Sequence, residues 1–481
     1  MLTRKCLFGH LAVVLMKKIW SRYGITMAYF KLEIELTNFH VNIHKVSIAV
    51  FLFLLLVYAW SVMRRDKGRF PPGPKPVPLL GNLHQLPMDY QHIKFAEWGK
   101  QYGDVSFAHL FHTPTLILNS LQAAQDLMDK RSAKYSDRPR FVLMSELMGW
   151  DCVLSTMGYG DRCRKHRKWI HEAFQAKPVL ESYYPLQRRE SSVLLSGLLE
   201  SPEAYIAHFR RFASALVLEI AYGHRVTSLE DKYLRVAERA TTATAEAGSP
   251  GSMLVDFFPF LKELPAWFPG CGFKRQALDV RPHIRVFLDM PFQMVKDAMA
   301  TGITIPSMTA TLIEKCSGNE GISEEDEEDI KGTAGVLYGA GTETMVTALT
   351  TFVMAMVLYP NVLKKAREEI DRVIGNERLP DFTDRDSLPY LGCILKELYR
   401  WNSPLPLGQA FGDSSLWLAM AHMIATLDIR KSVDNFGKEI NFEAAFSPGF
   451  TSAPKPFTCV ILPRNKKACE LVQSVNADFA H

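Results

Sequence analysis

The feature that most constrains the fold is a long helical stretch from Ser323 to about Tyr359. Ser323 is a good N-cap residue, and the acidic run 324–328 places negative charge at the positive end of the helix dipole. Beyond Lys331 the stretch is apolar on every side. A helix of this kind has to be buried, and here its length predicts burial through the middle of a large domain.

The rest of the body, residues 91–481, is predicted to be mainly α with a small β part. Val105 to Leu110 and Thr115 to Asn119 have the composition of a strand pair, with Thr113-Pro114 as the turn between them. A chain of 481 residues exceeds the usual size of one core, but no linker-like segment divides this part of it.

An uncharged apolar run at residues 46–63 predicts a transmembrane anchor, because it just reaches the length that a spanning helix needs. Tyr58 and Trp60 lie near one end, where interfacial aromatics belong. Residues 64–90 form a basic and proline-rich hinge, and its basic start favours a cytoplasmic body. A cleaved signal peptide and a buried core helix are the alternatives. No role is predicted for the extension 1–45.

Charge and cysteine content exclude some classes of function. A net charge of +5 with no basic stripe interleaved with aromatics gives no support for nucleic-acid binding. The eight cysteines are scattered, without the paired spacing of a zinc site or a disulfide framework. Such a chain fits a reducing compartment.

One short motif inside the long helix can carry chemistry. Ala340, Gly341 and Thr344 surround a carboxylate at Glu343 in an otherwise apolar segment. Glycine and threonine weaken a helix in its middle, and a local bulge or kink would open room beside it. An acid beside a hydroxyl can pass protons into a dry cavity. A satisfied core threonine and a paired glutamate explain the same residues.

Two further helices carry charged motifs. Glu397 and Arg400 are three apart and can pair on one face of a helix, although most such pairs are solvated surface pairs. Earlier, a dense set of basic residues surrounds Trp169, with Arg167 among them. That basic helix is either a solvated face or a docking patch for an acidic partner.

In this order, the anchor, proline-rich hinge, basic helix, Ala-Gly-x-Glu-Thr helix and Glu-x-x-Arg helix resemble the microsomal cytochromes P-450. The segments 142–174 and 416–429 are most similar to fungal members, which are associated with secondary metabolism. The resemblance implies a P-450 fold and a haem-dependent monooxygenase that inserts one oxygen atom from O₂ into a lipophilic substrate. It also implies an endoplasmic reticulum membrane location, with electrons from NADPH delivered by a membrane-bound reductase.

The resemblance also implies roles for individual residues. Thr344 would organise the water chain that delivers protons to iron-bound dioxygen, with Glu343 as its acidic neighbour. Ala340 and Gly341 would lie against the haem and the oxygen pocket, and Arg167 would pair with a haem propionate. Glu397 and Arg400 would form a structural ion pair on the opposite side of the haem.

Three departures from the family pattern limit that expectation. Cys163 stands where the family usually has a tryptophan, and the segment that completes the ion pair of Glu397 and Arg400 is absent. The loop Phe-x-x-Gly-x-Arg-x-Cys-x-Gly, which carries the axial cysteine, is also absent, so the sequence offers no metal ligand. The chain passes from Ala410 directly into Phe411, which resembles the start of the helix after that loop. A deletion near 410–411 is therefore predicted.

Without the thiolate, the iron loses the electron density that favours O–O cleavage. The sequence therefore predicts a family member that is inactive as written. No glycine-rich surround lets Cys393, Cys459 or Cys469 replace the missing ligand. The alternatives are a non-enzymatic truncated membrane protein and a membrane-tethered adaptor that docks an acidic partner through the basic helix.

Overall fold

A computed structural model describes residues 50–53, 55–56, 70–174, 177–248, 253–303, 305–319, 321–402, 409–448 and 451–479. The chain divides into two units, Met1–Lys67 and Gly68–His481. In the first unit, residues 50–53 and 55–56 are helical and most of their apolar side chains are exposed. The remainder of the predicted anchor 46–63 and the whole extension 1–45 lie outside the described residues.

The second unit is mainly helical, as predicted. Its α-helices are α3 (Gln91–Tyr102), α4 (Leu121–Ala124), α5 (Ser132–Tyr135), α6 (Asp161–Phe174), α7 (Lys177–Ser182), α8 (Tyr184–Glu200), α9 (Tyr205–Tyr222), α10 (Lys232–Ala247), α11 (Leu254–Phe257), α12 (Gly272–Ala300), α13 (Met308–Cys316), α14 (Glu324–Leu358), α15 (Pro360–Val373), α16 (Pro389–Trp401), α17 (Gln409–Thr426) and α18 (Lys466–Phe479). Its strands are β1 (Val105–Leu110), β2 (Thr113–Leu118), β3 (Leu427–Lys431) and β4 (Cys459–Pro463).

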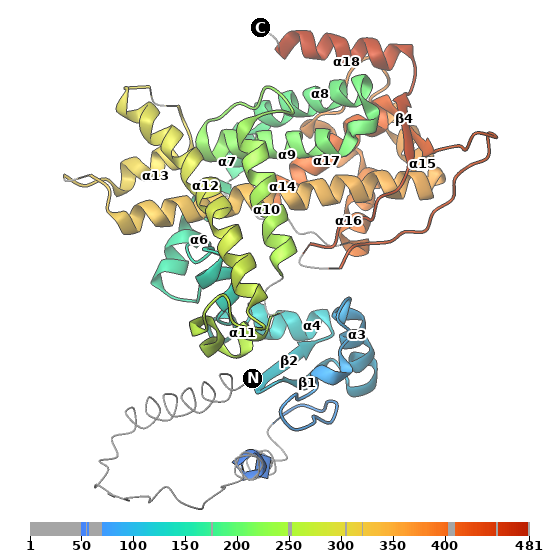
Figure 1. The fold of residues 1–481 in the computed structure, drawn as a ribbon. Helices are drawn as coiled ribbons and strands as arrows, with labels where there is room; N and C mark the ends of the chain where they lie inside the picture. The colour runs from blue at the N-terminus through green and yellow to red at the C-terminus, as the bar shows by residue number, and fades with distance from the viewer. Residues whose placement is uncertain are drawn as a thin grey trace, which may run out of the picture. The chain divides into compact units, whose positions relative to one another are not determined.

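The helix α14 runs through the centre of this unit, with α8, α9 and α17 on one side and α6 and α16 on the other (Figure 1). Ser323 caps it, because its hydroxyl accepts the N–H of Asp326 at 3.1 Å. It is the one helix among the described residues that is long and apolar enough to cross a membrane. Since 78% of its most apolar stretch is buried, it behaves as a core helix.

Glycines let α14 approach its neighbours closely. A Cβ at Gly332 would lie 2.0 Å from the backbone oxygen of Cys152, in the loop before α6. A Cβ at Gly335 would lie 2.4 Å from a methyl group of Leu288 on α12. The absence of a side chain at these positions therefore allows contacts that would otherwise be blocked. The helix is continuous from Glu324 to Leu358, without the bulge that the sequence suggested.

The small β part consists of two antiparallel pairs, β1 with β2 and β3 with β4. The predicted turn at Thr113-Pro114 is wrong, because both residues belong to β2 and Pro114 is paired with His109. The turn lies one step earlier, where Phe111 has a positive φ of 53°. A two-stranded sheet has only edge strands, so a proline without an N–H donor is accommodated there.

A buried histidine joins α17 to α8 and to the segment before α16. His422 donates from Nε2 to the backbone oxygen of Pro380 at 2.9 Å, so its Nδ1 accepts the Ser191 hydroxyl at 2.8 Å. Burial lowers the pKa of His422 to about 4, because the charged imidazole would lose its hydration. The ring is therefore neutral in the folded chain at pH 7.

This burial predicts a pH dependence of stability. The unfolded chain binds a proton at His422 near pH 6.5 and the folded chain does not until about pH 4, so stability falls as the pH is lowered through this window. The slope attributable to this group is at most about 1.4 kcal/mol per pH unit. Urea unfolding of His422→Gln between pH 7 and 4.5 should show a shallower decline than the wild type.

The matched control is His171→Gln, since His171 is exposed on α6. Its pH dependence should follow that of the wild type. Equal slopes in the wild type and both variants would mean that His422 is not buried in its neutral form.

Candidate functional site

The middle of α14 has a partly exposed strip inside the buried core. Ala340, Glu343 and Thr344 are partly exposed, whereas Tyr338 before them and Met345 after them are buried. These are the residues that sequence analysis singled out, and the structure brings them together on neighbouring turns of one helix. Such a strip in a core helix is a surface that a bound group could cover.

The hydroxyl of Thr344 donates to the backbone oxygen of Ala340 at 2.7 Å. This bond to the preceding turn is the behaviour expected of threonine in the middle of a helix. Thr344 keeps an acceptor lone pair free for an incoming donor. Gly341 faces α9, where a Cβ would lie 3.0 Å from a methyl group of Val217. Its visible role is therefore close helix packing.

Glu343 forms an ion pair with Arg210 of α9. Both side chains are partly exposed, so this carboxylate does not lie unpaired in the apolar core. Next to it, the hydroxyls of Ser214 and Thr342 lie 3.4 Å apart and join the same two helices. Sequence analysis anticipated a paired glutamate as one explanation but not its partner, which lies 133 positions away.

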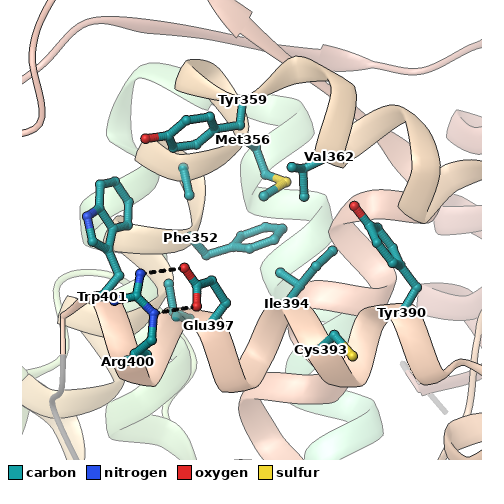
Figure 2. Close-up of a pocket in the computed structure, with 12 residues that line it drawn as sticks. Phe352, Met356, Tyr359, Val362, Tyr390, Cys393, Ile394, Glu397, Arg400 and Trp401 are labelled. Carbon is teal, nitrogen blue, oxygen red and sulfur yellow. Dashed lines mark hydrogen bonds and ion pairs between the residues drawn. The ribbon is translucent and has the colours of Figure 1, made fainter.

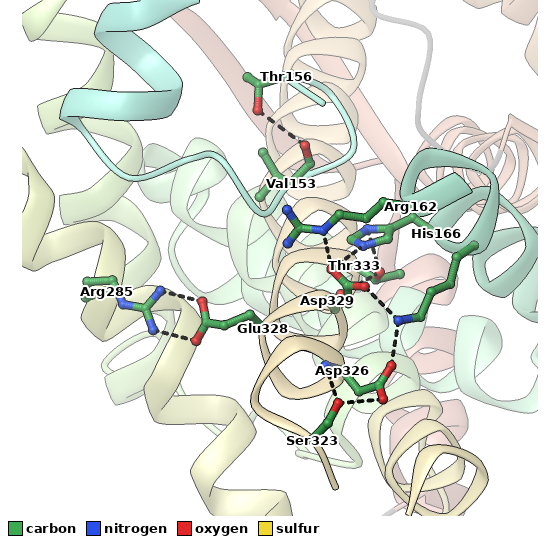
Figure 3. A network of polar contacts seen from close by, with 11 residues as sticks. Val153, Thr156, Arg162, His166, Arg285, Ser323, Asp326, Glu328, Asp329 and Thr333 are labelled. Atoms are coloured by element: carbon green, nitrogen blue, oxygen red, sulfur yellow. Dashed lines mark hydrogen bonds and ion pairs between the residues drawn. The ribbon is translucent and has the colours of Figure 1, made fainter. Parts of the chain in front are cut away.

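The basic helix α6 is held against the start of α14 by one buried carboxylate, as Figure 3 shows. Asp329 is fully buried and receives Arg162 Nε at 2.5 Å and Lys165 Nζ at 2.7 Å. His166 Nε2 lies 3.1 Å from the same carboxylate, and Thr333 bonds to His166 Nδ1 at 2.9 Å. This group, Asp329 with its three α6 partners, is called the Asp329 clamp below.

Electrostatics favours the charged form of Asp329. Burial alone would raise the pKa of this carboxyl, but hydrogen bonds from Lys165, Arg162 and His166 outweigh it and lower the pKa. The sequence contains a signal for the clamp. The cations at 162, 165 and 166 share one face of a helix, and so do Asp326 and Asp329.

The outer face of α6 carries the residue expected to bind a haem propionate. Arg167 is exposed and forms no hydrogen bond or ion pair with another described residue. Its neighbours Arg164 and Lys168 are paired within the helix, with Asp161 and Glu172. Cys163, in the place of the expected tryptophan, is buried. An unpaired guanidinium suits an anionic group.

Glu397 and Arg400 form the predicted ion pair, with two hydrogen bonds of 2.7 Å (Figure 2). The side chains are 59% and 70% exposed, so the pair lies at the surface and its partner segment does not cover it. It borders a groove of about 370 Å³ between α14, α15 and α16. Phe352, Met356, Tyr359, Tyr390, Ile394 and Trp401 are among the side chains that line this α16 groove.

The described cysteines do not fit the role of an axial thiolate. Burial raises the pKa of Cys459 to about 11 and that of Cys152 to about 12, which keeps both thiols protonated. Cys393 is exposed on α16, and Cys163 and Cys271 are buried within the helical body. The α14 strip and Arg167 could lie beside haem, but these cysteines supply no ligand for its iron. No catalytic step through haem is therefore derived for this chain.

The Asp329 clamp yields a test of what holds α6 in place. Asp329→Asn should lower the free energy of unfolding by roughly 2 to 3 kcal/mol, because it leaves Arg162 and Lys165 without their buried counter-charge. Both cations can turn toward water, which limits the loss. Urea unfolding followed by circular dichroism measures the change.

Asp161→Asn is the matched control, since Asp161 pairs with Arg164 on the exposed side of the same helix. It should leave the unfolding midpoint unchanged, because exposed pairs contribute little. An Asp329→Asn variant as stable as this control would mean that the clamp does not hold the two helices together.

Comparisons with known proteins agree on one family. A family model described as cytochrome P-450 matches residues 71–410. Cytochrome P-450 monooxygenase 136 of Postia placenta is 39% identical, over 88% of this chain and 94% of the relative. Cytochrome P-450 monooxygenase claR of Ampulloclitocybe clavipes is 33% identical, over 91% of this chain and 94% of the relative.

The lengths of these alignments differ from the length of this chain. The alignment to the Postia protein has 495 positions but includes 88% of 481 residues, or about 423, so about 72 positions hold a residue of the relative alone. Cytochrome P-450 monooxygenase COX2 of Coprinopsis cinerea is 40% identical over 355 positions, which cover 74% of this chain and 67% of that protein.

Proposed function

The chain belongs to the cytochrome P-450 family, and we propose that it is a membrane-anchored member that does not form the haem-thiolate centre. Members of this family are haem-dependent monooxygenases that receive electrons from a redox partner. The observation that carries the proposal is the lack of a cysteine able to serve as axial ligand among the described residues. Without that ligand the family's oxygen chemistry cannot proceed.

Two features of the comparisons support a deletion near residues 410–411. The family match ends at residue 410, which is where the sequence passes abruptly to the helix α17. The Postia relative also has about 72 aligned positions without a counterpart in this chain, as worked out from the coverage above. A segment of such a size could hold both the loop with the axial cysteine and the partner segment of Glu397 and Arg400.

The same chain keeps the features that would serve a restored centre. When bound, haem would supply oxygen activation. The carboxylate of Glu343 and the hydroxyl of Thr344 would hold protons beside it, and the guanidinium of Arg167 would hold a propionate. Ala340 and Gly341 would form the apolar surface against the ring. This arrangement explains why a monooxygenase-like α14 persists in a chain without the ligand.

We assign the body to the cytoplasmic side of the endoplasmic reticulum membrane. The support is the apolar run 46–63 followed by a basic segment. A membrane-bound reductase that uses NADPH is the expected electron donor, and lipophilic compounds are the expected substrates of a restored form. A docking role for α6 has one supporting observation, the exposed and unpaired Arg167.

The decisive measurement is the carbon-monoxide difference spectrum of the reduced protein. The chain as written should lack the red-shifted band of thiolate-ligated haem. A second version should show it, with the corresponding segment of the Postia relative inserted between Ala410 and Phe411. The matched control is the same insert with its ligand cysteine replaced by serine, which should lose the band.

A red-shifted band from the chain as written would overturn the proposal. Replacement of Cys393, Cys459 and Cys469 in turn would then identify the ligand. If the restored version binds no haem while its circular dichroism matches the original, the missing segment is not the reason for inactivity.

A further inference from the structure

The α16 groove is an aromatic-lined surface that nothing in the described chain covers. Phe352 and Met356 form its floor, and Tyr359 and Trp401 stand at one side of it (Figure 2). Tyr359 is 53% exposed although it is a large aromatic residue. An open apolar hollow of this size is suited to receive an inserted side chain.

A single aromatic side chain projects from another part of the same unit. Phe436 is 94% exposed and lies in the segment between β3 and β4, which extends from the helical body (Figure 1). Full exposure of a phenylalanine in water is unfavourable by roughly 1.5 to 3 kcal/mol relative to its burial. It also shows that Phe436 does not fill the groove of its own chain.

The backbone around Phe436 is fixed before any partner arrives. The carboxylate of Asp434 accepts the N–H groups of Phe436 and Lys438, each at 2.9 Å. Gly437 takes a positive φ of 79° and donates its N–H to the backbone oxygen of Asp434 at 3.0 Å. A bridge between Val433 and Glu439 closes the turn. A rigid aromatic knob loses little entropy when it binds.

Charges beside the knob match charges beside the groove. Lys438 is exposed and its ammonium group has no partner among the described residues. Asp434 supplies a negative charge on the other side of Phe436. The rim of the groove carries Glu397 and Arg400, so each rim charge has an opposite charge on the knob. Such complementarity selects an orientation as well as a partner.

We propose that a second copy of this chain occupies the α16 groove, with Phe436 of one copy inserted between the aromatic walls of the other. Knob and groove are different surfaces of one chain, so the contact is either reciprocal in a closed dimer or repeated along a row of copies. The proposal needs no haem and does not rest on the proposed function.

A disulfide trap tests the contact directly, because Cys393 lines the groove and is exposed. The full-length chain in detergent carries Phe436→Cys and is oxidised gently with a copper phenanthroline complex. The copper complex accepts the two electrons as the two thiols join with loss of two protons. Disulfide-linked species that dithiothreitol dissolves should form, and mass spectrometry should place the bond at Cys393.

Two variants provide the controls for the trap. Phe436→Cys combined with Cys393→Ser should give no linked species. Met88→Cys introduces a thiol at a position that is also 94% exposed but lies outside this turn, and it should not link to Cys393. A link that survives the loss of Cys393, or that Met88→Cys forms equally well, would overturn the proposal.

Sedimentation of the chain without added cysteines gives an independent measure. Phe436→Ser should weaken self-association by about 10- to 100-fold, the loss expected when one buried aromatic anchor is removed. Met88→Ser should leave association unchanged, and neither variant should shift the unfolding midpoint, since both side chains are exposed. A wild-type chain that stays monomeric at every concentration would contradict the proposal.

Discussion

The packing of α14 through the centre of the helical unit is the constraint on which the rest of the structure depends. Gly332 and Gly335 let backbone and side chains approach α14 at distances that no other residue would allow. The helices that pack on it therefore have fixed positions along its length. The strip of Ala340, Glu343 and Thr344 is defined by the same packing, because it is what the neighbours leave uncovered.

Sequence patterns predicted the features that local physics determines. The N-cap at Ser323, the acidic first turn and Pro360 gave the ends of α14 to within about a residue. The strand pair was also found, but Pro114 was misplaced because a proline reads as a turn unless the strand is known to be an edge. The existence of a signal was thus predictable, and its exact context was not.

The polar contacts of the site depend on distant parts of the chain. Arg210 meets Glu343 across 133 positions, and Arg162 meets Asp329 across 167. No local pattern reports such pairs, since α9 and α6 reach α14 only after the whole unit has folded. The exposure of Glu397 and Arg400 was likewise beyond the sequence, which predicted their pairing but not the surface on which they lie.

The Asp329 clamp has a consequence for the order of events in assembly. The position of α6 is set by contacts within the polypeptide and needs no bound group. One half of the expected cradle, with Arg167 and the α14 strip, is thus ordered by protein contacts alone. Any ligand that reaches this half meets a surface whose conformational entropy is already spent, so recognition there can be rapid even when retention fails.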